Sequence, residues 1–230
     1  MMKLAALAIA FVLPFATCAE AQIPTSSAEF RTNSAADAKV RGAIELDRLV
    51  RCAMSRRENL ARNILLTRPG SNEQERVIAP FRRVMENCMN DLVPGMFLGN
   101  VETRGAIAEV LYLRQYPTQP VFAALDHKPL GLPKSWTGGK INEYEKVQVL
   151  GQDFSNCVVA KAREDADALL RTEIRSPAER NFFRRLVPLL GPCLPKGLKM
   201  ELDVAWLRSV LAEALLRGMG EWQPAVSGRS

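Results

Sequence analysis

Two glutamates in this 230-residue chain could perform acid–base chemistry, because each lies inside a short apolar run. Glu109 falls within residues 107–111 and Glu213 within residues 211–215, so both carboxylates are expected to be partly buried. Two carboxyl groups about 5 to 9.5 Å apart can cleave a glycosidic bond. If the fold brings both side chains together, the protein is a hydrolase of envelope glycans. The alternative is a structural role, in which each buried carboxylate is paired with a donor.

Arg104 and Arg208 are candidate donors, since each precedes one of these glutamates by five positions. That spacing places arginine and glutamate on different faces of one helix, so a pair would have to form across helices. Gly105 and Ser209 lie four positions before the glutamates, and their small size lets a neighbouring helix approach closely. We expect the two arginines and the two glutamates to be buried polar residues that recur in both halves of the chain.

His127 is the only histidine, and it follows Asp126 in a proline-rich stretch. A Ser-His-Asp or Cys-His site would have to be built on it. The sequence contains no G-x-S-x-G, H-E-x-x-H or glycine-rich phosphate-binding motif. We therefore expect His127 in an exposed loop, and we assign the chain no catalytic residue, no metal site and no cofactor.

The cysteines reveal an internal repeat. Cys52 and Cys88 are 36 positions apart, Cys157 and Cys193 are also 36 apart, and an offset of 105 superimposes the two pairs. Removal of Cys18 with a leader leaves four cysteines and three possible connectivities. Duplicated units would each inherit one bridge, which predicts Cys52–Cys88 and Cys157–Cys193, each contributing about 3 to 4 kcal/mol. A zinc site is the alternative, but it usually requires close C-x-x-C pairs, which are absent.

The repeat extends beyond the cysteines. At the same offset, the matching residues are Ala61, Leu65, Thr67, Ser71 and Gln74 with Ala166, Leu170, Thr172, Ser176 and Glu179. After a one-residue gap, residues 104–111 match residues 208–215. A period near 105 is too long for common solenoid repeats but long enough for a small domain.

Helical periodicity predicts an all-α fold of two tandem pseudo-equivalent four-helix units, each with one internal disulfide, joined by a Pro/Gly-rich connector. The expected segments are a signal peptide over 1–21, a flexible segment over 22–34, unit 1 over 35–114, the connector over 115–144, unit 2 over 145–217 and a flexible tail over 218–230. The expected helices are 35–56, 58–66, 72–89 and 101–114 in unit 1, and 145–162, 164–172, one from Ser176 and one capped by Asp203 in unit 2.

The third helix of each unit should begin at a capping box, at Ser71 and at Ser176. Pro80 should kink or split the first of these helices, and Pro188 should end or kink the second near Val187. The connector is too apolar for a free linker, so we expect it to pack across the helices with a short strand or hairpin. The two units should pack through their fourth helices or across this connector.

The first 21 residues have the pattern of a cleaved leader, with Lys3 before an apolar run and Ala19-Glu20-Ala21 as the cleavage site. No later apolar stretch approaches the length needed to span a bilayer. We therefore expect a periplasmic or secreted protein whose mature chain begins at Gln22. The alternative is a lipoprotein anchored at Cys18, although the residue before it is not small.

The chain is basic, with 31 Lys and Arg against 25 Asp and Glu and a net charge of +6. Three arginine doublets contribute, at 56–57, 82–83 and 184–185. A positive surface favours an anionic envelope component or an acidic protein as partner. The alternative is that these arginines only solvate outer helix faces. Nucleic acid is disfavoured by the compartment and by the lack of a basic stripe interleaved with aromatics.

Several strings resemble a group of small secreted proteins of sphingomonad-type alphaproteobacteria, whose function is uncharacterised. They are residues 156–159, 169–172, 189–195 and 208–215. The resemblance covers unit 2 well and unit 1 more loosely, and it implies an exported, duplicated, cysteine-paired helical protein without assigning an activity. We therefore expect a non-enzymatic binding or envelope-associated module, with the glycan hydrolase as the alternative. The sequence does not specify its ligand, its oligomeric state or its physiological process.

Export should remove the leader. When the full chain is expressed with its own leader in a Gram-negative host, the protein recovered from the periplasm should have the intact mass of a chain beginning at Gln22. A mass that corresponds to a chain beginning at a lipid-modified Cys18 would instead establish the lipoprotein alternative.

Overall fold

The computed structural model describes residues 34–89, 100–122, 140–194 and 204–219. Within these ranges the protein is all-helical, as expected, with seven helices and no strand. The helices are α1 (Ser34–Leu66), α2 (Asn72–Glu86), α3 (Asn100–Gln115), α5 (Glu143–Lys161), α6 (Arg163–Leu170), α7 (Pro177–Cys193) and α8 (Val204–Gly218). None of the helices described is both long and apolar enough to cross a bilayer. The expected leader, most of the connector, His127 and Asp203 lie outside the described residues.

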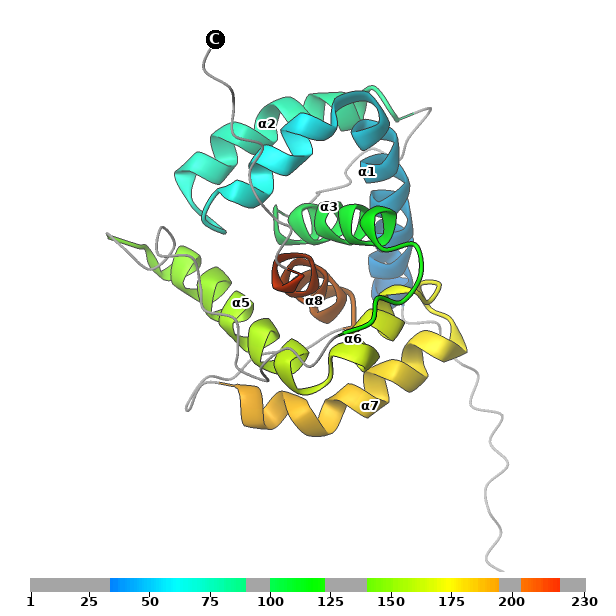
Figure 1. The fold of residues 1–230 in the computed structure, drawn as a ribbon. Helices are drawn as coiled ribbons and strands as arrows, with labels where there is room; N and C mark the ends of the chain where they lie inside the picture. Colours follow the sequence, from blue (N-terminus) through cyan, green and yellow to red (C-terminus); the bar gives the residue numbers. More distant parts are fainter. Residues whose placement is uncertain (1–33, 90–99, 123–139, 195–203, 220–230) are drawn as a thin grey trace, which may run out of the picture. The chain divides into compact units, whose positions relative to one another are not determined.

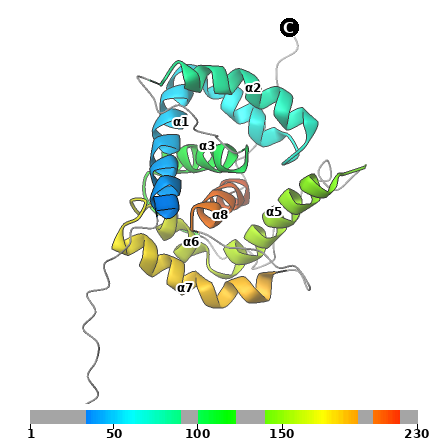
Figure 2. The same ribbon diagram turned by 180° about the vertical axis from the view of Figure 1, so that it is seen from behind.

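Helices α3 and α8 lie side by side at the centre of the helical unit in both views (Figure 1, Figure 2) and form its most extensive helix–helix contact. On one side α1 packs on α3 and on α2, and on the other side α5 and α6 pack on α8. The central pair crosses at Gly105, where a Cβ, if the residue had one, would lie 2.2 Å from the Cβ of Ser209. Only glycine fits there, so the two small residues set how closely the central helices approach.

Residues related by the repeat offset adopt the same unusual backbone conformations. We call two residues equivalent when they are 105 positions apart, or 104 within α3 and α8. Arg57 has φ −147° and ψ 59°, and its equivalent Ala162 has φ −148° and ψ 55°. This break divides α1 into two helical segments at the expected place and separates α5 from α6. Gly70 and its equivalent Arg175 both have positive φ, at 75° and 70°.

The capping boxes form as expected. The Ser71 hydroxyl accepts a hydrogen bond of 3.1 Å from the backbone N–H of Gln74, and the Gln74 side chain accepts one of 2.7 Å from Gly70 N–H. Ser176 and Glu179 make the same pair of bonds, at 3.0 and 2.7 Å, before α7. Because each serine satisfies an orphan amide of the first turn, and the Gln or Glu side chain ties that turn to the residue before the cap, these contacts fix where α2 and α7 begin.

The prolines neither split α2 nor end α7 near Val187, and the alternative expectation of a kink at these places stays a prediction. Helix α2 runs through Pro80, and α7 runs through Pro188 to Cys193 instead of ending near Val187. An interior proline removes one helical hydrogen bond and crowds the preceding turn. In α7 the loss is offset by contacts that follow Pro188, because Leu190 is buried in the core and Cys193 is bonded to α5.

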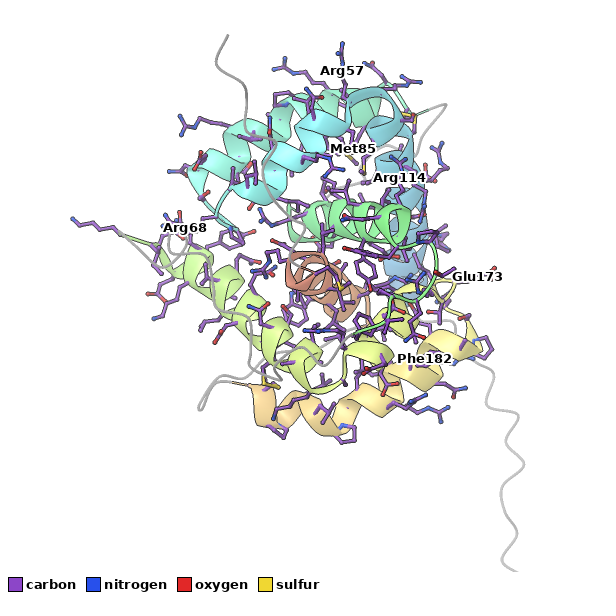
Figure 3. The ribbon with its side chains drawn as sticks, in the orientation of Figure 1. Arg57, Arg68, Met85, Arg114, Glu173 and Phe182 are labelled. Atoms are coloured by element: carbon purple, nitrogen blue, oxygen red, sulfur yellow. A yellow bond between two sulfur atoms is a disulfide. The ribbon has the colours of Figure 1, made fainter. Side chains whose placement is uncertain are left out.

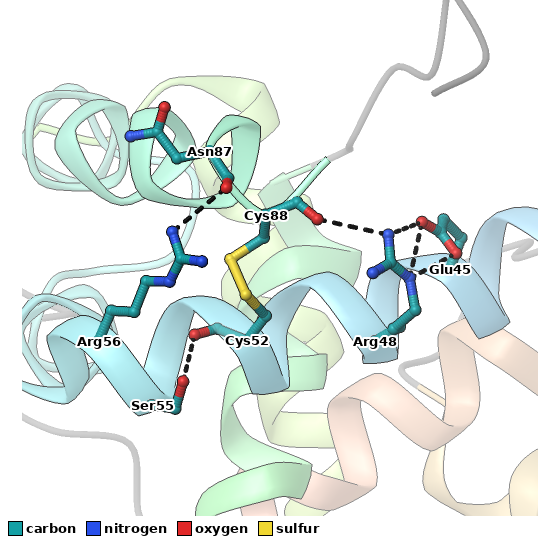
Figure 4. The surroundings of a disulfide bond; sticks show 7 residues. All are labelled: Glu45, Arg48, Cys52, Ser55, Arg56, Asn87 and Cys88. Carbon is teal, nitrogen blue, oxygen red and sulfur yellow. Dashed lines mark hydrogen bonds and ion pairs between the residues drawn. A yellow bond between two sulfur atoms is a disulfide. The ribbon is translucent and has the colours of Figure 1, made fainter. Parts of the chain in front are cut away.

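Both expected disulfides are confirmed, Cys52–Cys88 and Cys157–Cys193. The first joins α1 to the residue that lies just beyond the C-terminus of α2 (Figure 4). Arg56 donates a hydrogen bond of 3.2 Å to the carbonyl of Asn87 beside this bridge. Covalent and polar links therefore hold the end of α2 against α1.

The apolar core is continuous through all seven described helices. Buried members from the two halves include Leu49, Ile64, Phe81, Ala108, Val158, Leu169, Leu190 and Leu211. Because one core is shared, neither half buries its apolar surface alone.

Adding a side chain at the central crossing should destabilise the protein. A Gly105→Ala substitution places its Cβ within 2.5 Å of the Ser209 backbone, so α3 and α8 must separate. We expect the free energy of unfolding in urea to fall by roughly 1 to 3 kcal/mol. Gly42→Ala is the matched control, since nothing lies within 4 Å of its Cβ position. Equal stability of the two variants would contradict the close crossing.

Candidate binding cleft and its arginine–glutamate pairs

Arg104 on α3 forms a buried ion pair with Glu213 on α8. Its Nε and Nη2 each donate a hydrogen bond of 2.7 Å to one carboxylate oxygen. The same guanidinium also donates to the carbonyls of Ile64 and Leu65 at the end of α1, at 2.7 and 2.8 Å. Both paired side chains are only 2% exposed. Arg104 thus satisfies the last carbonyls of one helix while it neutralises a carboxylate on another.

Arg208 on α8 makes the equivalent contacts in the opposite direction. It donates to Glu109 on α3 through Nε and Nη2, at 2.8 and 2.6 Å. It also donates to the carbonyls of Leu169 and Leu170 at the end of α6, at 3.0 and 2.7 Å. A second carboxylate, that of Glu179, lies 3.2 Å from it. The two pairs cross the central helix contact in opposite directions, so each arginine depends on a glutamate from the other half.

The surroundings of the two glutamates differ. Glu213 accepts a third hydrogen bond, of 3.0 Å, from the side-chain amide of Gln152. The equivalent of Gln152 is Asp47, a carboxylate that has no proton to donate and accepts instead from Arg51 at 2.8 and 3.0 Å. Among the described residues, Glu109 accepts hydrogen bonds from Arg208 alone. Glu109 therefore keeps an acceptor site that its equivalent fills.

Burial and neighbouring charges both shift the pKa values of Glu109 and Arg208. Burial is the main cause that raises the pKa of Glu109, Arg208 opposes it, and Asp47 adds to it. For Arg208, burial lowers the pKa of the guanidinium, but Glu109 and Glu179 outweigh this effect and the pKa is raised. The arginine therefore remains charged while the Glu109 carboxylate is held in a partly desolvated, proton-attracting environment.

An open cleft of about 690 Å³ lies against the Glu109–Arg208 pair. It is lined by Ile44, Asp47, Arg51, Glu109, Leu113, Pro117, Leu170, Arg171, Thr172, Glu173, Ile174 and Arg208. The equivalent place beside the Arg104–Glu213 pair is a cavity of about 10 Å³, room for one water. Glu109 lines the cleft and Glu213 lines the small cavity, so the two carboxylates do not share one solvent-reachable space.

Side-chain size explains why one place is closed and the other open. In the closed place, Tyr144 and Gln148 on α5 pack 3.1 Å from the position that a Cβ of Gly70 would occupy. An ion pair of 3.0 Å between Arg68 and Glu145 adds a second link there. The equivalent of Gln148 is Ala43, which directly precedes the cleft residue Ile44, and its methyl group is too short to make the contact that Gln148 makes.

The two places lie on opposite sides of the central helix pair. Figure 3 labels Arg68 at the closed place and its equivalent Glu173 at the open one. Glu173 is exposed, whereas Arg68 pairs with a residue on α5. With Glu173 in place of an arginine, the open place lacks the ion pair that joins Arg68 to α5 at the closed place.

One wall of the cleft is held by a buried polar cluster. Tyr112 donates a hydrogen bond of 2.7 Å to Asp167, which also accepts from Arg171 at 2.8 and 2.9 Å. Arg171 in turn donates to the carbonyls of Tyr116, Pro117 and Thr118. Burial and the bond to Asp167 raise the pKa of Tyr112, so its phenol remains a donor. This cluster fastens the start of the connector to α6.

The repeated sequence pattern indicated the glutamates and their arginines but not the cleft. Asp47, Arg51 and Arg171 were not singled out, because none belongs to a motif. The sequence does contain a signal for the cleft, because equivalent positions differ there. Asp47 is equivalent to Gln152, and Arg51 is equivalent to Asn156. Among the described residues, no group of three His, Cys, Asp or Glu side chains is placed to hold a metal ion.

Comparison with protein-family models, with curated protein sequences and with solved structures returned no match. The function is therefore argued from the cleft and its residues.

The enclosed ion pair should be needed for stability. Glu213→Gln leaves Arg104 buried without a counter-charge, so we expect the free energy of unfolding in urea to fall by about 3 to 5 kcal/mol. Glu58→Gln is the control, because its pair with Arg62 is about 40% exposed on both sides and its loss should cost less than about 1 kcal/mol. Similar losses in both variants would show that burial does not strengthen the Arg104 pair.

Proposed function

We propose that this protein is an exported, non-enzymatic binding module, built by tandem duplication of a helical unit, and that the open cleft takes up part of an anionic partner. The observation that carries the proposal is the contrast between the two equivalent places. One is packed to about 10 Å³ and the other is left open at about 690 Å³. Ligand sites typically enclose about 300 to 1,000 Å³.

Duplication is supported by contacts that recur in detail. Each arginine of the central helices donates to two carbonyls of the short helix in its own half, at Ile64 and Leu65 or at Leu169 and Leu170. The same offset relates the two disulfides, the two capping boxes and the two helix breaks. Independent origins would not reproduce polar contacts, backbone angles and bridges at one offset.

Export is supported by the two disulfides, which persist in oxidising compartments and are rare in the cytosol.

Preference for an anionic group is supported by Arg51. Its side chain is 46% exposed and lines the cleft. Only its Nε is engaged, by Asp47, within the described part of the chain. The terminal nitrogens of the guanidinium are thus available to a carboxylate or phosphate oxygen, which such a fork binds well.

The contacts that Glu109 and Glu213 make favour a binding role over hydrolysis. Glu109 and Glu213 are each bonded to an arginine that is itself bonded to helix-end carbonyls. The two line different cavities, whereas the acid–base pair of a glycosidase must act on one bond.

The test is retention on immobilised envelope material from an alphaproteobacterium, with wild-type protein beside Ala43→Gln. The substitution introduces, next to the cleft residue Ile44, the side chain that lines the equivalent cavity, and it leaves the net charge unchanged. We expect wild-type retention that falls as salt rises, and retention several-fold lower for Ala43→Gln. Gln148→Ala is the control and should bind as the wild type does. Equal retention of wild type and Ala43→Gln, or none by either, would overturn the proposal.

A further inference from the structure

Among the described residues, Glu109 at the open cleft accepts hydrogen bonds from one residue, whereas its equivalent Glu213 accepts them from two. At the closed place, the Gln152 amide donates to Glu213 at 3.0 Å in addition to the two bonds from Arg104. At the open place, the equivalent residue Asp47 is a carboxylate and has no proton to donate to Glu109. A carboxylate offers about four acceptor positions, so a ligand N–H group can occupy on Glu109 the position that Gln152 occupies on Glu213.

The charge around this acceptor favours a cationic donor. Asp47 and Glu109 both line the cleft, so an ammonium group between them would meet two carboxylates. Over the whole lining, three acidic residues are balanced by three arginines. A ligand that matches such a surface carries a cationic group as well as the anionic group that Arg51 can bind.

Arg51 is positioned to bind an anionic group of the ligand. It lies one helical turn from Asp47 on the same face of α1. The Arg51 Nε is already in contact with the Asp47 carboxylate at 2.8 and 3.0 Å, so a ligand carboxylate is assigned to the terminal nitrogens of Arg51. The cleft of about 690 Å³ falls in the size range of small-molecule sites, which admits a dipeptide or tripeptide.

The remaining lining is apolar. Ile44 is 50% exposed at the cleft, and Leu113 and Ile174 are half-buried there. Exposed Ile44 can contact apolar side chains of a ligand. Removal of such side chains from water lowers the free energy of binding.

We propose that the cleft binds a short zwitterionic peptide with apolar side chains, its ammonium group on Glu109 and Asp47 and its carboxylate on Arg51. This assignment rests on the proposed function, since it names the ligand of the same cleft. Glu109 is thereby both a structural partner of Arg208 and a recognition group for the ligand.

The experiment is calorimetric titration of the full mature chain with leucyl-leucine, with leucyl-leucine amide and with N-acetyl-leucyl-leucine. We expect the free dipeptide to bind, and each blocked form to bind roughly tenfold more weakly or worse, because each loses one charge-assisted contact. Ala43→Gln should abolish binding of all three.

Arg51→Gln assigns the carboxylate contact. It should weaken binding of the dipeptide to the level of its amide and leave the affinity of the amide itself unchanged. Arg48→Gln is the matched control, because Arg48 pairs with Glu45 on α1 and does not line the cleft. Equal affinity of Arg51→Gln and wild type for the free dipeptide would overturn the assignment of the carboxylate to Arg51.

Different results would overturn the peptide assignment and the binding function. If leucyl-leucine does not bind, or binds no better than its blocked forms, while retention on envelope material still depends on position 43, the peptide assignment is overturned and the binding function stands. If Ala43→Gln changes neither dipeptide binding nor envelope retention, the cleft itself is not the site.

Discussion

A buried guanidinium must find acceptors for its donors, and this requirement governs the arrangement of the two halves. Arg104 and Arg208 cannot reach the glutamate five positions ahead on their own helices, so each takes the glutamate of the other central helix. The remaining donors bind the carbonyls that end α1 and α6. Desolvation of such a pair is costly, and it is repaid only when every donor is matched. Separation of the halves would leave two arginines and two glutamates unmatched at once.

The crossed pairs require a close central contact, and the sequence provides it at one point. Gly105 and Ser209 meet where α3 and α8 cross, four positions before the glutamates. A larger residue there would move both carboxylates away from their arginines, since the pairs lie on either side of the crossing. The disulfides act farther out, where Cys52–Cys88 and Cys157–Cys193 hold α2 and α7 to their own halves. Ionic contacts join the halves, and covalent bonds stabilise each half internally.

Repetition made much of this predictable from the sequence. Two cysteine pairs at one offset gave the bridges, two capping boxes gave the starts of α2 and α7, and the five-residue spacing implied pairing across helices. Helix ends near prolines were not predictable, because local propensity at Pro188 is outweighed by the tertiary contacts of Leu190 and Cys193. The cleft was missed for another reason. Tyr144 and Gln148 pack at the closed place, whereas the equivalent of Gln148 is Ala43, and a short side chain forms no recognisable pattern until its longer equivalent is seen in place.

The difference between the two places also shows which contacts the central helices depend on. At the closed place, Gln152 bonds Glu213 and is itself bonded by Arg217 at 2.7 Å, so a change at any of these positions breaks a buried network. At the open place, Asp47 and Arg51 pair with each other at the surface and leave the Glu109–Arg208 pair intact. One half therefore has the dense packing that stabilises the central helices. The other half has the ion pair without that packing, and the open cleft lies beside it.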